Sequence, residues 1–175
     1  MLTVPVFDFG AFEAAYNAER QARGLSWFEF ADELTDQSAD LNEVLGDHAV
    51  CGGAVSRLGA RGATSCQYAL LMMRWMGRAP EDFLTTGGAR FGPVKLPEPG
   101  PGSRLRWNLP QLYLALDARR TERGLRWAEL AALIGCTPSR LTNLRTARLA
   151  DLELTMRVTQ WLGRPSSDFI HAADW

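Results

Sequence analysis

An internal repeat constrains the fold of this 175-residue chain more than any other feature. The segment 23–31 (RGLSWFEFA) returns as 123–131 (RGLRWAELA), an offset of 127 − 27 = 100 when the tryptophans are aligned. A second block, within 58–83, returns within 144–169 at an offset of 161 − 75 = 86. The first copy therefore holds 100 − 86 = 14 extra residues between its two blocks. Self-similarity of this length indicates two copies of one folding unit.

The two copies carry opposite charge. We divide the chain into an N-terminal domain (1–84), a linker rich in Gly and Pro (85–104) and a C-terminal domain (105–175). Over 11–84 six Arg face eleven Asp and Glu, a balance of 6 − 11 = −5; over 104–170 the balance is 11 − 6 = +5. Such asymmetry indicates nucleic-acid binding by the basic half. Chance variation between small surfaces is the alternative explanation.

Composition narrows the class of protein. No apolar run approaches the ~18 residues of a transmembrane helix. The N-terminus lacks a basic start and Asp8 interrupts its apolar residues, so no signal peptide is expected. The three cysteines, Cys51, Cys66 and Cys136, are too few and wrongly spaced for a disulfide framework. We therefore predict a cytoplasmic protein with reduced thiols.

The basic copy is predicted to form five short helices. The second spans 127–134, and a tight turn separates it from a third helix over 138–146, which Thr137 caps. This third helix has only Leu141 and Leu144 as apolar residues, so its other face is polar. The remaining helices are expected around 112–120, 152–162 and 166–170.

Two helices joined by a short Gly-containing turn are typical of a helix-turn-helix. The run RGLRWAELAALIGCTPSRLTNLRTARLADLELTMRVTQWLGRPSSDFI resembles the Cro/C1-type (XRE-like) helix-turn-helix domain of phage and bacterial repressors. The likeness covers roughly 105–170. It is carried by the Arg-Gly-Leu after helix one, the Glu-Leu-Ala of helix two, the Gly-Cys-Thr turn and the Trp-Leu-Gly ending helix four. It implies an all-α chain of two lambda-repressor-like helix-turn-helix domains, each of about five helices, with the first copy degenerate.

The same resemblance implies how DNA would be bound. In that family the second helix of the motif, here 138–146, lies in the major groove. The side chains that would read bases are Ser139, Arg140, Thr142 and Asn143. Those that would contact phosphate are Arg126, Thr137, Arg145 and Arg148. A merely solvated polar face is the alternative.

One position departs from the family pattern. The family often pairs the arginine of helix one, here Arg120, with a glutamate late in helix three. That position holds Arg145 here and Gly59 in the first copy, so Arg120 is expected to pair with another acid or with phosphate.

The first copy is predicted to be a poor reader of DNA. Its extra residues form an acidic inserted loop, 35–48, and Gly52 and Gly53 weaken the start of its third helix. An acidic surface would repel the phosphate backbone. Its apolar fourth helix, with Leu70, Leu71, Met73 and Met76, indicates either an interaction surface, for dimerisation or for packing on the second copy, or plain core filling. The opposing hypothesis is that both copies bind DNA as a single-chain pseudo-dimer.

Little in the chain indicates catalysis. The histidines, His48 and His171, lack a nucleophile and orienting acid at recognisable spacing. His48 and Cys51 have the spacing of two metal ligands, but a structural zinc site needs four. We therefore predict no enzyme activity, no metal and no cofactor.

These patterns together predict a transcriptional regulator, specifically a repressor. It would bind double-stranded DNA sequence-specifically through the C-terminal domain and act as a homodimer. A protein partner could bind the N-terminal domain. The alternative is a protein-interaction module on a helix-turn-helix fold, such as an antitoxin or an anti-regulator.

Overall fold

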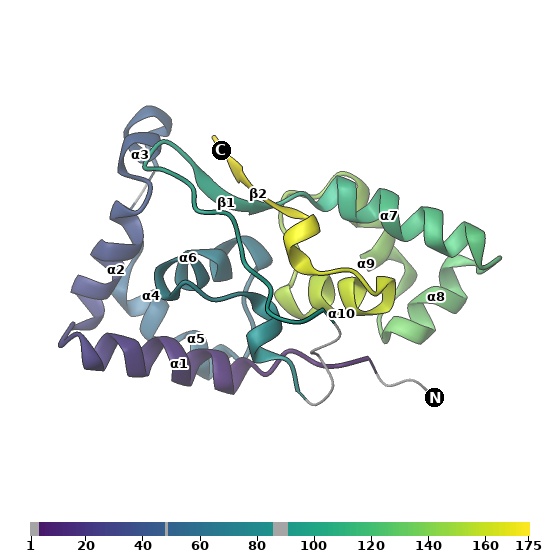
Figure 1. Ribbon diagram of the computed structural model, residues 1–175, viewed down its shortest axis with the longest axis horizontal. Helices are drawn as coiled ribbons and strands as arrows, with labels where there is room; N and C mark the ends of the chain where they lie inside the picture. The colour runs from purple at the N-terminus through teal and green to yellow at the C-terminus, as the bar shows by residue number, and fades with distance from the viewer. Residues whose placement is uncertain (1–3, 48, 86–90) are drawn as a thin grey trace.

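The computed structural model describes residues 4–47, 49–85 and 91–175 and is mostly helical (Figure 1). The expected helical character is confirmed, and a two-stranded sheet that the sequence pattern did not predict accompanies it. The first copy occupies one side of the view in Figure 1 and the second copy the other. Every helix in these ranges is too short or too polar to traverse a bilayer.

Where it is described, the first copy is built from helices, and one isolated bridge joins Phe7 to Leu84. Ser26 begins α2 with a capping box, in which it exchanges hydrogen bonds with Glu29. Gly77 ends α6 at a φ of 66°, a left-handed conformation that favours glycine. The elements are α1 (Phe9–Ala22), α2 (Trp27–Asp36), α3 (Ala39–Leu45), α4 (Gly52–Ser56), α5 (Leu58–Arg61), α6 (Cys66–Met76) and the 3₁₀ turn η1 (Pro80–Phe83).

The second copy is enclosed by a strand at each end. Strand β1 (Arg104–Trp107) pairs antiparallel with β2 (Ile170–Ala173), with Trp107 opposite Ile170. Leu105 and Trp107 face the core while Arg104 and Arg106 lie on the other face, as the period of a strand requires. Between the strands lie α7 (Leu109–Glu122), α8 (Trp127–Ile134), α9 (Pro138–Thr142), η2 (Asn143–Arg145), α10 (Leu152–Leu162) and η3 (Ser166–Asp168).

The repeat is visible in individual contacts. Arg20 lies over the ring of Trp27 and donates a hydrogen bond to the carbonyl oxygen of Leu25; the same contacts recur 100 residues later. The Asp8 side chain caps α1 and its backbone N–H donates to Phe83, and Asn108 does the same with Phe169. The two copies are therefore similar in local construction as well as in sequence.

The copies meet through equivalent residues. The backbone N–H of Cys66 donates to the carbonyl oxygen of Ala150 at 2.7 Å, and that of Leu152 donates to Thr64 at 3.1 Å. The partners correspond at the same offset, since 150 − 64 = 86 and 152 − 66 = 86. An exchange of equivalent contacts is what a two-fold axis produces. We call this contact the seam, and the buried apolar side chains on both sides of it belong to one continuous cluster.

The insertion is not the loop that we expected over 35–48. Helix α2 continues to Asp36, and α3 follows until Gly46 ends it in a left-handed conformation. The insertion also lies against the linker, because Leu41 donates to Pro101 and Asp47 pairs with Arg104 at 2.5 Å. His48 lies outside the described residues.

The linker predicted over 85–104 is held in place where it is described. Residues 91–103 form turns, bends and backbone without regular secondary structure before β1 begins, while 86–90 lie outside the described residues. Arg74 of α6 holds this segment, because its guanidinium donates to carbonyl oxygens of Gln37, Pro99, Gly100 and Ser103. The segment therefore packs on the first copy.

Candidate nucleic-acid interface

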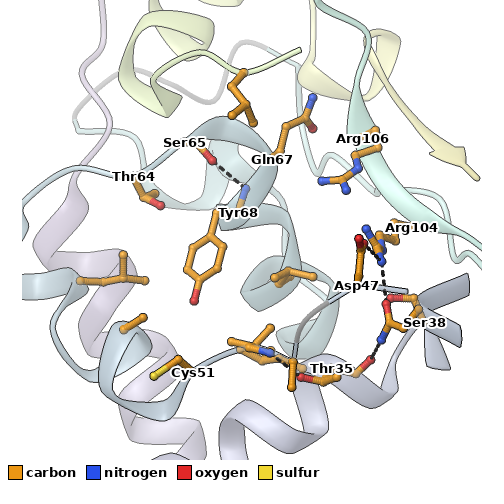
Figure 2. Close-up of a pocket in the computed structure, with 18 of the residues that line it drawn as sticks. Thr35, Ser38, Asp47, Cys51, Thr64, Ser65, Gln67, Tyr68, Arg104 and Arg106 are labelled. Atoms are coloured by element: carbon orange, nitrogen blue, oxygen red, sulfur yellow. Dashed lines mark hydrogen bonds and ion pairs between the residues drawn. The ribbon is translucent and has the colours of Figure 1, made fainter. Parts of the chain in front are cut away.

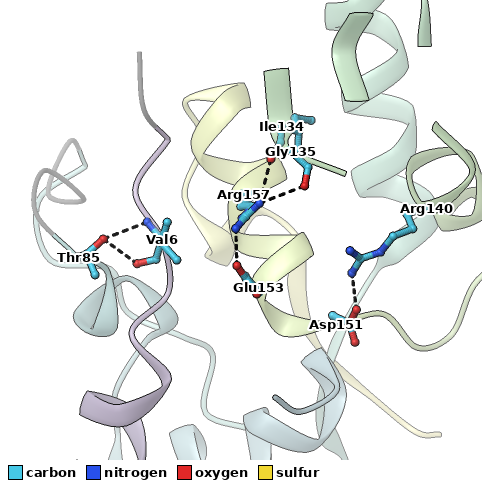
Figure 3. A network of polar contacts seen from close by, with 8 residues as sticks. All are labelled: Val6, Thr85, Ile134, Gly135, Arg140, Asp151, Glu153 and Arg157. Atoms are coloured by element: carbon cyan, nitrogen blue, oxygen red, sulfur yellow. Dashed lines mark hydrogen bonds and ion pairs between the residues drawn. The ribbon is translucent and has the colours of Figure 1, made fainter. Parts of the chain in front are cut away.

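A tight turn joins α8 to α9. Gly135 ends α8 at a φ of 83°, and Thr137 precedes α9 with Pro138 at the first helical position. Thr137 makes no side-chain capping bond; its hydroxyl lies 3.2 Å from that of Ser139. Arg157 of α10 supports the turn by donating to the carbonyl oxygens of Ile134 and Gly135 at 3.3 Å (Figure 3). The sequence did not single out this arginine.

The predicted base-reading residues lie on the outer side of α9 and η2. Leu141 and Leu144 are buried and anchor this segment to the core. Among the predicted readers, Ser139, Arg140 and Asn143 are exposed, whereas Thr142 is half-buried and bonds to the Ser139 carbonyl. Helix α9 is shorter than the expected 138–146, because the chain tightens into a 3₁₀ turn at Asn143.

Arg140 already has a partner. Its guanidinium pairs with the carboxylate of Asp151 (Figure 3). Asp151 stands at the N-cap position of α10 but makes no capping bond there. It also forms an isolated β-bridge with Ser65 at the seam. The ion pair therefore connects the outer face of α9 to the junction of the two copies.

The predicted phosphate-binding residues differ in how they are held. The side chain of Arg126 is 83% exposed and pairs with Glu129 at 3.0 Å. Hydrogen bonding to this carboxylate raises the pKa of Arg126, and the guanidinium lowers the pKa of Glu129. Arg145 is exposed, and Arg148 is exposed with its guanidinium 5.2 Å from the centre of the Trp175 ring.

The acidic partner of Arg120 belongs to the same helix, α7. It pairs with Asp117 at 2.6 Å and lies over Trp127, so it stabilises the junction of α7 and α8. Arg120 therefore has an acidic partner, although the glutamate that the resembling family often has late in helix three is absent here.

A shallow hollow of about 330 Å³ lies at the seam, beside this segment. Arg140 and Asn143 line it from the second copy, and Ser65 lines it from the first. The polar face of α9 and η2 thus extends toward residues of the other copy.

The interaction residues predicted in α6 lie in the core and along the seam with the second copy. Leu70 and Met73 are 1% and 0% exposed, so neither can contact a partner without unfolding. Leu71 and Met76 are half-buried and pack against the same cluster. The seam explains the wide apolar face, because α6 contacts α10 and β1 as well as its own copy.

In the first copy, the helix that corresponds to α9 is α4. Gly52 lets α4 approach α2 closely, since an added Cβ would lie 3.0 Å from the carbonyl oxygen of Trp27. Gly59 replaces Arg145, and a Cβ there would overlap the carboxylate of Glu13. The first copy therefore has the carboxylate of Glu13 beside the position that corresponds to Arg145 in the second copy.

The comparisons with known proteins identify no relative. No family model, no curated protein and no solved structure matches this chain.

The candidate metal ligands do not come together among the described residues. Within these ranges no three His, Cys, Asp or Glu side chains are arranged to hold a metal ion. His171 is part of β2, opposite Arg106. The part of the metal hypothesis that rested on His48 lies outside the described residues.

Proposed function

We propose that this protein is a sequence-specific regulator that binds double-stranded DNA through its second copy, most simply as a repressor. The observation that carries the proposal is the exposed polar face of α9 and η2, held outward by Leu141 and Leu144 directly after a tight turn. A polar helix presented in this way fits the major groove, where side chains reach base edges. Asn143 would bond adenine, and Arg140 would read guanine or hold phosphate.

The charge of the second copy supports the same proposal. Arg126 and Arg145 are exposed near the two ends of the helix pair, where the DNA backbone would pass. The first copy, with its balance of −5, would repel that backbone. We therefore propose that only the second copy reads DNA, and that two chains form a homodimer to cover two half-sites.

The test compares a base contact with a phosphate contact. Fluorescence anisotropy would measure binding to DNA from directly upstream of its own coding region and to a scrambled duplex, over a salt series. Asn143→Ala should weaken the preferred site by about 1–3 kcal/mol and relax specificity. Arg145→Ala should weaken all duplexes alike and flatten the salt dependence.

Arg119→Ala, a change in α7 of an arginine that pairs with Glu122, serves as the control and should bind like wild type. If neither test variant changes binding, α9 is not the reading helix. No binding to any duplex at low salt would contradict the proposal as a whole.

A protein-interaction module is the second candidate, and one observation favours it. Val44 and Leu45 of α3 are 82% and 43% exposed, which is unusual for large apolar side chains on one short helix. Such a partner would bind at α3 rather than at the buried residues of α6. Val44→Asp together with Leu45→Asp should then abolish capture of the partner and leave DNA binding unchanged.

A further inference from the structure

A cavity of about 700 Å³ lies in the first copy, beside the strand that leads into the second (Figure 2). Helices α2, α4 and α6 provide apolar walls through residues such as Leu34, Ala54 and Leu71. Sites for small organic ligands usually have this size and are mostly apolar with a few polar groups.

Two guanidinium groups form one wall of this cavity. Arg104 and Arg106 are two residues apart on β1, so both side chains lie on the face opposite the core. Arg104 bonds to Asn42 and pairs with Asp47. Burial and the neighbouring Arg104 both lower the pKa of Arg106, whose Nε donates to the backbone oxygen of Trp175 at 2.7 Å. Among the described side chains that line the cavity, one carboxylate, that of Asp47, accompanies three arginines, Arg61 being the third.

The cavity wall also holds an unsatisfied polar atom. The hydroxyl of Tyr68 is buried and has no hydrogen-bond partner among the described residues. Burial raises the pKa of Tyr68, so the hydroxyl keeps its proton at neutral pH. A buried polar group without a partner is costly, and a polar ligand in the cavity would supply one.

We propose that this cavity binds a small organic acid with an apolar body, whose carboxylate lies against Arg104 and Arg106. The apolar walls accommodate the body, and the carboxylate adds negative charge at a wall where three arginines accompany one acidic side chain. A carboxylate also matches the planar fork of a guanidinium.

The same wall connects the cavity to the proposed DNA-binding copy. Gln67, only 2% exposed, exchanges hydrogen bonds with the backbone of Trp107 and also donates to the carbonyl oxygen of Arg148. Leu149 lines the cavity directly, and it follows η2 by a few residues. A bound acid would therefore alter the segment behind the reading helix and change DNA affinity, an effector role that rests on the function proposed above.

The first experiment measures ligand binding without DNA. Cys51 lines the cavity and is exposed, whereas Cys66 is buried, so the rate of thiol labelling at Cys51 reports occupancy. Probes are benzoate, phenylacetate and octanoate, with their amides as neutral counterparts. The acids should slow labelling and raise the melting temperature, and the amides should do so at least about tenfold more weakly. The half-buried Cys136 does not line the cavity and gives a separate background signal, so Cys51→Ser identifies the signal of the cavity as the part that it removes.

Two variants shift affinity in opposite directions. Arg106→Gln should weaken acid binding about tenfold or more, because a charged hydrogen bond is lost. Asp47→Asn should tighten it several-fold, because the competing carboxylate is removed from Arg104. Arg78→Gln changes an arginine of the first copy that does not line the cavity, and should have no effect.

The outcomes separate this proposal from the previous one. If none of the acids slows labelling or raises the melting temperature, or if amides bind equally well, the cavity is not an organic-acid site. If an acid binds as expected but leaves the affinity of wild type for its preferred duplex unchanged, the effector role is wrong. If the chain binds no DNA, the regulator proposal fails while the binding result stands.

Discussion

Arg140 and Asp151 form an ion pair that joins the outer face of α9 to the start of α10, beside the seam. An exposed ion pair of this kind contributes little to stability, because water and salt screen it. The carboxylate of Asp151 nevertheless binds the guanidinium of Arg140, which without it would be available to contact a base or a phosphate. In the proposed complex with DNA, the pair would therefore matter more for binding than for folding.

Asp151→Asn should strengthen DNA binding several-fold at low salt, because it removes a negative charge beside the reading helix and releases Arg140. Asparagine remains a good residue at an N-cap, so the fold should be preserved. Anisotropy titrations would measure the change, with Asp168→Asn as the control because its partner is Arg164, beyond α10. Weaker binding by Asp151→Asn would mean that the ion pair orients Arg140 productively.

At the scale of elements, the pair α8 and α9 depends on two buried leucines. Leu141 is 0% exposed, whereas Leu133 on the neighbouring α8 is 56% exposed. The same substitution at the two positions therefore separates core packing from surface effects.

Leu141→Ala should lower the free energy of unfolding by about 2–5 kcal/mol, because it leaves a cavity behind α9. Leu133→Ala should change it by less than about 0.5 kcal/mol. Urea denaturation followed by circular dichroism would measure both. Equal effects at the two positions would contradict the burial of α9 described above.

The helix pair could be predicted from sequence because its signals are local: a glycine, a proline and two leucines at helical spacing. Strand β1 could not, because it is four residues long and its partner β2 lies more than sixty residues further along the chain (170 − 104 = 66). Helix α3 belongs to the insertion, which has no counterpart in the other copy. Leu70 and Met73 belong to a stripe for which the sequence left packing on the second copy, dimerisation and core filling open, because a stripe that packs on a second copy looks the same in sequence as one that binds a separate partner.

The missed parts of the candidate sites have similar causes. The cavity is built from side chains of α2, α4, α6 and β1, which only the tertiary fold brings together. The docking of Trp175 on Arg106 and Arg148 could not be inferred either, because its partners are distant in sequence. Arg157 carries no local signal, as it contacts a turn more than twenty residues earlier.

At the scale of the whole molecule, the shared core should make the two copies unfold together. Tryptophans lie in both copies, and the buried cluster crosses the seam. Gln67 adds buried hydrogen bonds between α6 and the second copy. Neither copy keeps this buried surface if the other is unfolded.

We expect one cooperative transition in urea, with tryptophan fluorescence and far-ultraviolet circular dichroism giving the same midpoint. Gln67→Ala should lower that midpoint without splitting the transition, because the apolar contact remains. Two separate transitions in the wild-type protein would mean that the copies are independent domains.

Because the two equivalent surfaces belong to one polypeptide, their pairing does not weaken on dilution as that of separate subunits does. In a symmetric pair of identical chains, every substitution appears twice, once on each side of the axis. Here each substitution appears once. One side could therefore acquire acids, an extra helix and a cavity while the other kept its arginines, and the backbone bonds between residues 64–66 and 150–152 would remain the same.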